Sequence, residues 1–258
     1  MKAMILAAGL GTRLRPLTND RPKALVEING RTLLQITIER LASVGVCEII
    51  INIHHFAGKV ADYLKSHNNF GLRIEISRED DLLLDTGGGL KKAAWFFLED
   101  SARNDEPFLL HNVDVISDID FARMLHHHQE NDALATLAAQ ERSSSRQLLF
   151  NDQLHLIGRR VDGNDEIAAQ SAVSITSSET KKLSSGSPLL PLAFSGIHIL
   201  SPRIFPFLTE TEPVFSIIDS YLRLAAQGHK ILAFRHDGSY WRDLGRPADL
   251  AQAARDLR

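Results

Sequence analysis

The sequence of 258 residues has a single cysteine, Cys47, so no disulfide can form within the chain. A lone cysteine favours a reducing compartment, and we expect a cytoplasmic protein. The sequence also has no excess of basic residues: it contains 29 Lys and Arg and 32 Asp and Glu, which gives a net charge of −3. Nucleic-acid binding is not expected, since nucleic-acid-binding domains are usually basic. No apolar run is long enough to span a bilayer, so we expect no membrane contact.

Short apolar runs alternate with helical patterns through the first 140 residues. Such an alternation predicts right-handed crossovers and a mainly parallel sheet that helices cover on both faces. The predicted strands are 2–8, 48–53, 72–77, 107–116 and 133–139, and the predicted helices are 31–45, 56–67, 88–100 and 121–131. The fold class is therefore α/β.

The pattern changes after residue 140. A hairpin at 146–159 and a polar, serine-rich stretch at 174–187 precede a strand at 191–200. A helix at 216–228, a strand at 230–236 and a helix at 246–257 follow. A length of 258 residues suggests one large domain or two small ones, and we predict one domain over 1–258 with halves 1–140 and 141–258. The polar stretch has the composition of a mobile flap.

The loop of residues 6–25 places glycines and basic side chains after the first strand. Gly9 and Gly11 let the main chain turn sharply and approach a ligand, and successive main-chain N–H groups form a concave anion site. Arg13 and Lys23 add positive charge. Ligands of parallel sheets bind at the carboxyl ends of the strands, where this loop lies, so we predict a polyphosphate site. A surface loop with solvated arginines is the alternative.

Neither of two known phosphate motifs accounts for this loop. The dinucleotide fingerprint lacks its third glycine, and the P-loop pattern is absent.

Two aspartates follow apolar strands. Asp114 ends the run before it and is expected to point toward the ligand crevice, and Asp243 follows the strand at 230–236. Turn and helix capping are the alternative roles.

A second glycine-rich stretch, residues 85–92, opens the predicted helix at 88–100. Thr86 can cap that helix at its N-terminus. The glycines at 87–89 leave room for a flat ring against the main chain, although close packing of helix and sheet also needs glycine.

The loop resembles the signature of the sugar-phosphate nucleotidyltransferases, G-x-G-x-R-x-x-P-L-T followed by P-K-x-L. The matching residues are Gly9, Gly11, Arg13, Pro16, Leu17, Thr18, Pro22, Lys23 and Leu25. The stretches "DTGGGLKKA", "HNVD", "FSGI" and "WRDLG" appear in the family's order. The resemblance implies a Rossmann-like three-layer α/β/α sandwich. It also implies a reaction of an NTP with a sugar 1-phosphate that gives an NDP-sugar and pyrophosphate. N-acetylmuramic acid, mannose or a related sugar is expected.

The resemblance also implies roles for individual residues. Arg13 and Lys23 are expected to be catalytic, and Asp114 and Asp243 to hold Mg²⁺, for which Mn²⁺ can substitute. The expected nucleotide-binding residues are Leu6, Ala8, Gly9, Gly11, Thr12, Arg13, Thr86, Gly87 and Gly88, and the expected sugar-binding residues are Asn112, Ser195 and Gly196.

The sequence departs from the family at Val113, where glycine is usual, and this puts the sugar pocket in question. The segment of residues 141–190 is expected to lie on the sugar side. The three histidines at 126–128 are expected to be solvated. A monomer or a homodimer is expected.

Two other functions stay open. A non-catalytic nucleotide-sugar-binding regulatory protein could share the fold, although it could dispense with Arg13, Lys23 or a metal carboxylate. A nucleotidyltransferase for a non-sugar phosphate such as phosphocholine is the second alternative.

Overall fold

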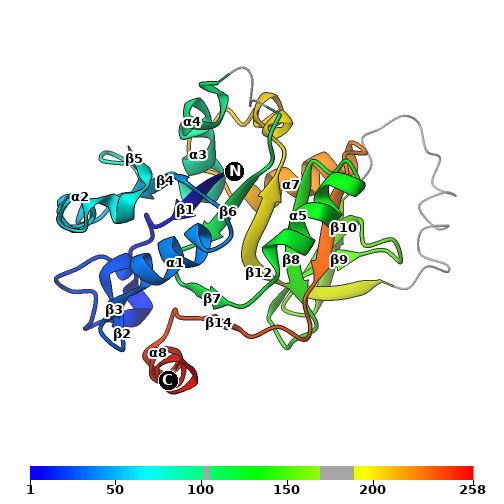
Figure 1. Ribbon diagram of the computed structural model, residues 1–258. Coiled ribbons are helices and arrows are strands. Elements are labelled where there is room, and N and C mark those ends of the chain that lie inside the picture. The colour runs from blue at the N-terminus through cyan, green and yellow to red at the C-terminus, as the bar shows by residue number, and fades with distance from the viewer. Residues whose placement is uncertain (101–104, 169–188, 258) are drawn as a thin grey trace, which may run out of the picture.

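The computed structural model of the protein describes residues 1–100, 105–168 and 189–257, and Figure 1 shows its ribbon. The serine-rich stretch predicted at 174–187 lies outside the described residues.

A parallel set of strands forms the first half of the central sheet. β1 (Lys2–Leu6) lies between β4 (Glu48–Ile53) and β6 (Phe108–Asn112), and β5 (Arg73–Arg78) adds to β4. All three ladders are parallel, and Leu6 lies level with both Asn52 and Asn112. The carboxyl ends of the strands therefore meet at one edge of the sheet, next to the loop that follows β1.

A long strand, β12 (Leu190–Leu200), joins this parallel set to an antiparallel half. β12 runs antiparallel to β6, to β8 (Ala135–Gln140) and to β9 (Arg146–Phe150). The remaining strands of this sheet are β10 (Leu156–Val161), β11 (Asn164–Ile167) and β13 (Ile231–Arg235), which is parallel to β8. The predicted α/β class is confirmed, and the sheet is mixed.

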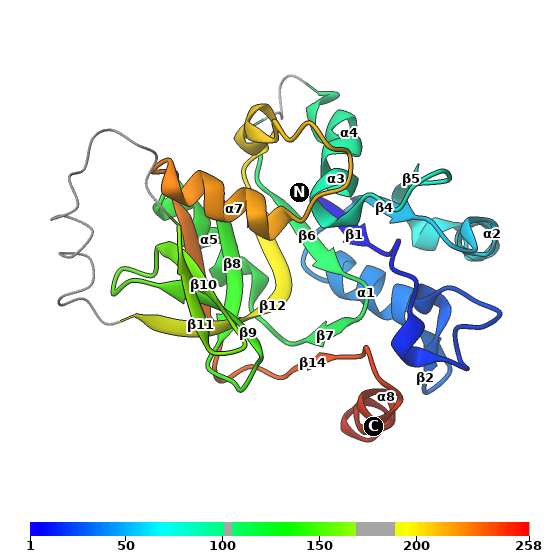
Figure 2. The same ribbon diagram turned by 180° about the vertical axis from the view of Figure 1, so that it is seen from behind.

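Helices cover both faces of the sheet, as Figures 1 and 2 show from opposite sides. One hydrophobic core contains residues of α1 (Leu33–Ala42), α2 (Ala57–Ser66) and α5 (Phe121–Glu130). The other contains residues of α3 (Asp85–Lys92), α4 (Ala94–Leu98) and α7 (Ile217–Ala226). Short 3₁₀ turns occur at η3 (Asn68–Gly71) and η4 (Pro202–Phe207).

Local sequence signals explain where several helices begin. The Thr32 hydroxyl accepts a hydrogen bond from the Gln35 N–H at the start of α1, and Asp120 and Ser216 cap α5 and α7 in the same way. α8 (Pro247–Asp256) begins at a proline, whose missing N–H costs nothing in a first turn.

Two predicted elements prove to be divided. The helix predicted at 88–100 begins earlier, at Asp85, and is interrupted at Ala93 (φ −84°, ψ 0°), which separates α3 from α4. The strand predicted at 107–116 is divided into β6 and β7 (Val115–Ser117) by a turn at residues 113–114. This turn places Asp114 at the sheet edge.

The prediction of three solvated histidines holds only for His126, because His127 is half-buried with its Nε2 buried and His128 is fully buried. His126 is exposed, but His128 is buried against the sheet, and its Nδ1 lies 2.9 Å from the Thr136 hydroxyl. Burial lowers the pKa of His128 to about 4, so its ring is neutral at pH 7.

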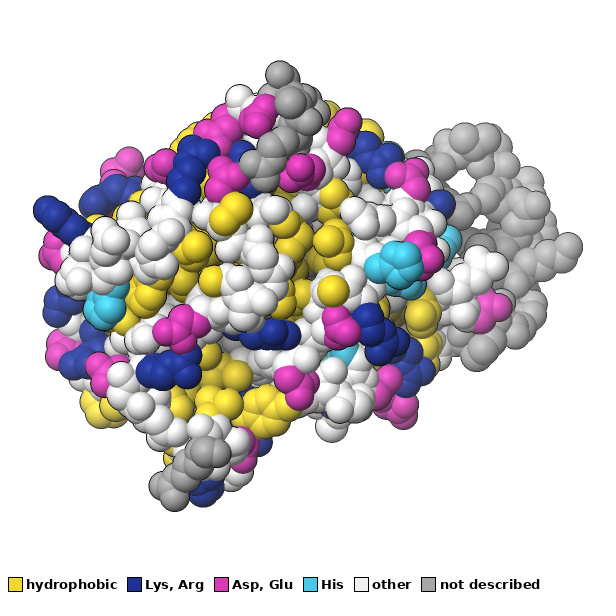
Figure 3. All heavy atoms as spheres, viewed as in Figure 1, with side chains coloured by type: hydrophobic (Ala, Val, Ile, Leu, Met, Phe, Trp, Pro, Cys, Tyr) yellow, Lys and Arg dark blue, Asp and Glu magenta, His cyan; other side chains and the backbone are white. Residues whose placement is uncertain are grey.

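No helix among residues 1–100, 105–168 and 189–257 is long and apolar enough to cross a membrane. Basic and acidic side chains are interspersed on the face shown in Figure 3.

We expect Gly88→Ala to destabilise the fold by about 1–3 kcal/mol, because its new methyl group would overpack a filled space. A Cβ at Gly88 would lie 2.1 Å from the Pro213 carbonyl oxygen. Gly58→Ala in α2 is the matched control, because a Cβ there meets nothing within 4 Å. The control should be neutral or stabilising by about 0.5–1 kcal/mol, as expected for alanine in a helix. Urea unfolding of both variants checks this, and equal midpoints would contradict it.

Candidate active site

The loop after β1 turns sharply at Gly11. Gly11 adopts a left-handed conformation (φ +65°) at the start of the 3₁₀ helix η1 (Thr12–Leu14), and its carbonyl accepts a 2.8 Å hydrogen bond from the Thr18 hydroxyl. A Cβ at Gly11 would lie 3.0 Å from Thr18 Cγ2. Conformation and space both require glycine here, whereas Gly9 is exposed with open space around it.

Lys23 forms an ion pair with Asp114. Lys23 begins the 3₁₀ helix η2 (Lys23–Leu25), and its ammonium donates a hydrogen bond to Asp114 Oδ2. The Lys23 and Asp114 side chains are only 10 % and 18 % exposed. A charge so poorly hydrated needs a partner, and each of these residues supplies one for the other. The predicted catalytic lysine and the first predicted metal ligand are thus in direct contact.

Asp243, the second predicted metal ligand, lies on a strand that pairs with β7, the strand after Asp114. β14 (Trp241–Asp243) pairs antiparallel with β7, which places Asp243 opposite Val115. The Leu244 N–H donates a 2.8 Å hydrogen bond to the Asp114 carbonyl oxygen. The structure therefore brings together two aspartates that are distant in the sequence.

The Arg13 guanidinium lies close to Asp243, and both side chains are next to Gly245. A Cβ at Gly245 would lie 2.6 Å from an Arg13 guanidinium nitrogen and 2.7 Å from Asp243 Oδ1. The Gly245 N–H donates a 2.6 Å hydrogen bond to Asp243 Oδ1, which fixes that carboxylate. The side chains of all four residues that the resemblance marks as catalytic or metal-binding therefore gather around one edge of the sheet.

The donor atoms of this group suit Mg²⁺. Magnesium takes oxygen ligands and usually only one or two carboxylates, because water and substrate phosphates supply the rest. Within the described part of the chain, no group of three or more His, Cys, Asp or Glu is arranged to hold a metal. Asp114 already pairs with a cation, the Lys23 ammonium. Two aspartates in this arrangement fit a metal ion that binds together with the triphosphate.

Val113 does not enter the site. Its side chain is 4 % exposed and lies in the hydrophobic core on the α1 side of the sheet, while its N–H donates a 3.1 Å hydrogen bond to the Leu6 carbonyl oxygen. The branched side chain is therefore part of the core packing.

A buried network that the sequence analysis missed supports the start of the loop. Glu79 is 1 % exposed and accepts hydrogen bonds from Asn52 Nδ2 at 2.7 Å and from the Leu84 N–H at 2.9 Å. Asn52 Oδ1 in turn accepts a 2.8 Å hydrogen bond from the Ala7 N–H. The sequence signal that could have indicated this network is the presence of polar residues near the ends of two apolar strands, 48–53 and 72–77. Ala8, a predicted nucleotide contact, follows directly and is buried, whereas Thr12 is exposed.

The glycines at 87–89 are closely packed. A Cβ at Gly87 would lie 2.3 Å from the Phe215 ring, and one at Gly89 would lie 2.8 Å from Asn52 Nδ2. Protein atoms therefore fill the space that the missing side chains leave, which matches the packing alternative. Contact between this main chain and a nucleobase stays a prediction.

Thr86 does not cap its own helix, which corrects the expectation from the sequence. Its hydroxyl accepts a 3.0 Å hydrogen bond from the Ile217 N–H at the start of α7. The Gly87 and Gly88 N–H groups donate to the Phe215 carbonyl oxygen at 2.9 and 3.3 Å. These bonds join the start of α3 to the start of α7 and to the segment just before it.

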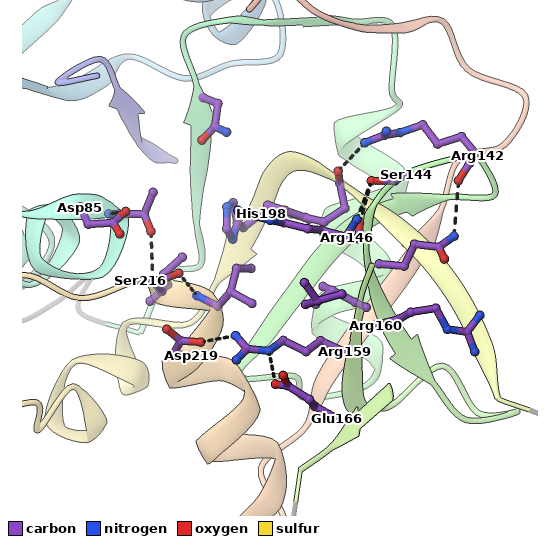
Figure 4. Close-up of a pocket in the computed structure, with 18 residues that line it drawn as sticks. Asp85, Arg142, Ser144, Arg146, Arg159, Arg160, Glu166, His198, Ser216 and Asp219 are labelled. Atoms are coloured by element: carbon purple, nitrogen blue, oxygen red, sulfur yellow. Dashed lines mark hydrogen bonds and ion pairs between the residues drawn. The ribbon is translucent and has the colours of Figure 1, made fainter. Parts of the chain in front are cut away.

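A cavity of about 690 Å³ lies between α3, α7 and the antiparallel strands β9 and β10 (Figure 4). Asn112 and Thr86 are the predicted site residues that line it. Arg142, Arg146 and Gln147 from the described part of the 141–190 segment also line it. The cavity thus lies where the two halves of the chain meet.

Asn112 faces Gly196 across the β6–β12 ladder. Gly196 has φ +73°, and a Cβ there would lie 2.8 Å from Asn112 Nδ2. The neighbouring His111 is buried, which lowers the pKa of its ring to about 4. Its neutral ring donates from Nδ1 to the Asn112 carbonyl oxygen at 2.8 Å, because a carbonyl can only accept.

Ser195 has a structural position. It is fully buried, its hydroxyl lies 2.7 Å from His236 Nε2, and its carbonyl oxygen accepts a 2.8 Å hydrogen bond from Trp241 Nε1. The expected contact of this side chain with a sugar is therefore not available in the structure.

Known proteins resemble this chain in sequence and in fold. The model of the nucleotidyl transferase family matches residues 2–147. An N-acetylmuramate alpha-1-phosphate uridylyltransferase of Caulobacter vibrioides is 34 % identical, and the match covers 98 % of this chain and 96 % of that protein.

The chain belongs to the nucleotidyl transferase family.

A mannose-1-phosphate guanyltransferase of Yarrowia lipolytica is 30 % identical over 96 % of the chain, which spans 62 % of that longer protein. Among solved structures, UDP-glucose pyrophosphorylase in complex with UDP-glucose has a TM-score of 0.74 at 21 % identity, and the match covers 99 % of this chain and 97 % of that one. The latter likeness establishes the fold alone. The predicted family and enzyme class, a sugar-1-phosphate nucleotidyltransferase, are confirmed.

We expect Glu79→Gln to raise KM for the nucleotide more than KM for the sugar phosphate. A glutamine has one oxygen in place of two, so either Asn52 Nδ2 or the Leu84 N–H loses its acceptor, at a cost of about 1–3 kcal/mol. The start of the loop should then move. Glu75→Gln on the same strand is the control, because Glu75 pairs at 3.6 Å with the exposed Arg73. Titration of both substrates tests this, and unchanged constants in a folded Glu79→Gln protein would contradict it.

Proposed function

We propose that the protein transfers a nucleotidyl group from an NTP to a sugar 1-phosphate in a Mg²⁺-dependent reaction that releases pyrophosphate. The observation that carries this proposal is the convergence of Arg13, Lys23, Asp114 and Asp243 beside the glycine-rich loop at the carboxyl edge of the sheet. A triphosphate and a sugar phosphate are both anionic, so bringing them together requires this mixture of cations and metal-binding carboxylates.

The reaction suits in-line attack of the sugar phosphate oxygen on the α-phosphorus, with pyrophosphate leaving from the opposite side. The protein then has mainly to position and neutralise its substrates. Lys23 and Arg13 supply donors to the phosphate oxygens, where negative charge increases in the transition state. Asp114 and Asp243 would hold the metal, which supplies charge neutralisation at the phosphates.

The two substrates fall on opposite sides of this group. The loop after β1 and the main chain at 87–88 would bind the nucleotide, and the cavity beyond Asn112 would bind the sugar. This arrangement follows the proposed division into a nucleotide-binding half, 1–140, and a sugar-binding half, 141–258. Gly196 would contribute by letting Asn112 approach.

UTP and N-acetylmuramic acid 1-phosphate are the proposed substrates. The relative that carries this name matches along nearly its whole length, whereas the chain spans only 62 % of the mannose-1-phosphate guanyltransferase described above. A cytoplasmic location would suit both substrates and agrees with the single cysteine.

We expect Lys23→Ala to lower kcat/KM by roughly 10²-fold or more, because a cation is lost from the charged transition state. Lys65→Ala on the exposed side of α2 is the control and should leave kcat/KM unchanged. Pyrophosphate release measures the effect, and circular dichroism checks that both variants fold. A folded Lys23→Ala protein with normal turnover would remove Lys23 from the catalytic group.

Activity should require Mg²⁺ or Mn²⁺ and should fall strongly in Asp243→Asn, which keeps the shape of the side chain but removes its charge. The measurement is pyrophosphate release over a grid of four NTPs and several sugar 1-phosphates, with and without EDTA. Turnover that survives excess EDTA would contradict the metal site. Binding of nucleotide without turnover of any acceptor would instead favour a regulatory protein, and turnover of phosphocholine alone would favour a non-sugar acceptor.

A further inference from the structure

Four arginines from the segment 142–160 line the cavity: Arg142, Arg146, Arg159 and Arg160 (Figure 4). A neutral sugar with a single phosphate does not need so many cations. The question is which of these guanidinium groups the protein already neutralises.

Acidic side chains neutralise two of the four. Arg159 donates to Glu166 Oε2 and to Asp219 Oδ1, each at 2.7 Å. Arg160 donates to Asp165 Oδ1 at 2.5 Å. Glu166 and Asp219 are two of the three acidic residues that line the cavity, so Arg159 is the arginine with which most of the carboxylates of the cavity are paired.

Arg142 is held by two contacts and has no carboxylate partner among the described residues. Its guanidinium donates to the Phe194 carbonyl oxygen at 2.9 Å and lies 4.2 Å above the centre of the Trp241 ring. Its Nε is buried without a hydrogen-bond partner in the described part of the chain. A buried and unpaired donor on a fixed guanidinium group indicates a missing acceptor.

Arg142 belongs to the reacting end of the cavity. Trp241, on which it stacks, lies in β14, the strand that ends at Asp243. Burial lowers the pKa of Arg142, and the charge of Asp243 opposes that shift, so the two residues are electrostatically coupled. The 1-phosphate of the acceptor must come close to Asp243 if that residue holds the metal, and Arg142 would then meet this phosphate.

Arg146, at the start of β9, is the remaining cation. The Ser144 hydroxyl bonds to both its main-chain N–H and its carbonyl oxygen, which fixes the main chain. Its guanidinium makes no hydrogen bond or ion pair with any described residue. The third acidic residue of the cavity, Asp85, accepts from the Thr86 N–H at 2.6 Å. Arg142 and Arg146 are therefore the two guanidinium groups of the cavity that have no carboxylate partner among the described residues, and a sugar with a single phosphate would leave one of them without an anionic partner.

We propose that the cavity selects an acidic sugar 1-phosphate, in which Arg142 binds the 1-phosphate and Arg146 pairs with a carboxylate on the sugar. This inference rests on the proposed function, because it assumes that the acceptor is a sugar 1-phosphate. A guanidinium group pairs with a carboxylate through two parallel hydrogen bonds, which provides both charge and orientation.

The test uses two acceptors that differ in the carboxylate. N-acetylmuramic acid 1-phosphate carries a lactyl carboxylate, and N-acetylglucosamine 1-phosphate lacks that lactyl group. The wild-type protein should prefer the acidic acceptor. Arg146→Gln should lower kcat/KM for the acidic acceptor at least about tenfold more than for the neutral one, since tenfold corresponds to about 1.4 kcal/mol. Arg142→Gln should lower kcat/KM for both acceptors.

The control is Arg123→Gln, an exposed arginine on α5 outside the cavity, which should change neither acceptor. Thermal melting confirms that each variant folds, and because Arg146 is exposed its replacement should not affect folding. Equal losses for the two acceptors in Arg146→Gln, or no wild-type preference for the acidic one, would overturn the inference but leave the proposed function intact. Absence of turnover with every NTP and sugar 1-phosphate would overturn both.

Discussion

The ion pair between Lys23 and Asp114 is the contact on which the arrangement of the site depends. It joins the loop that follows β1 to the turn that follows β6, across the carboxyl edge of the sheet. Both side chains are largely buried, so separating them without substituting another charge would be costly. Under the proposed function the substrates and the metal would supply such charges, because phosphates would pair with Lys23 and a divalent cation with Asp114. The ion pair would then preserve the geometry of the site until these ligands replace it.

Glycine is the second constraint, because the two halves of the chain meet where side chains are absent. Gly196 lets Asn112 approach β12, and Gly245 lets Arg13 approach Asp243. At 87–88 the start of α3 lies directly against the segment before α7, and the main-chain N–H groups bond to Phe215. Each of these glycines lies where one half of the chain packs against the other, so a methyl group at any of them would push the halves apart. The glycines at 87–89 are therefore required for packing, in addition to being a candidate surface for a nucleobase.

Charge is distributed unevenly between the two sides of the site. Beside the loop that follows β1, the buried Glu79 accepts hydrogen bonds from Asn52 and from the main chain, so it orients the loop. On the cavity side, Arg159 is paired while Arg142 and Arg146 have no carboxylate partner among the described residues. A ligand with two acidic groups would give each of these two guanidinium groups a partner, which is how a binding site can favour an acid over its neutral analogue.

The sequence by itself determined the class of fold and the chemistry. Alternating apolar runs and helical patterns are local signals, and the glycine-rich loop with Arg13 and Lys23 is a continuous motif, so both can be recognised without a structure. The division of the predicted strand at 107–116 and the burial of His128 could not be predicted, since both depend on packing against distant segments. The packing of Phe215 against Gly87 and the network around Glu79 join residues that are far apart along the chain. The ion pairing of the cavity arginines also depends on distant segments. Arg142, Arg146 and Arg159 cannot be told apart in the sequence, because only the tertiary structure shows which of them forms an ion pair with a carboxylate.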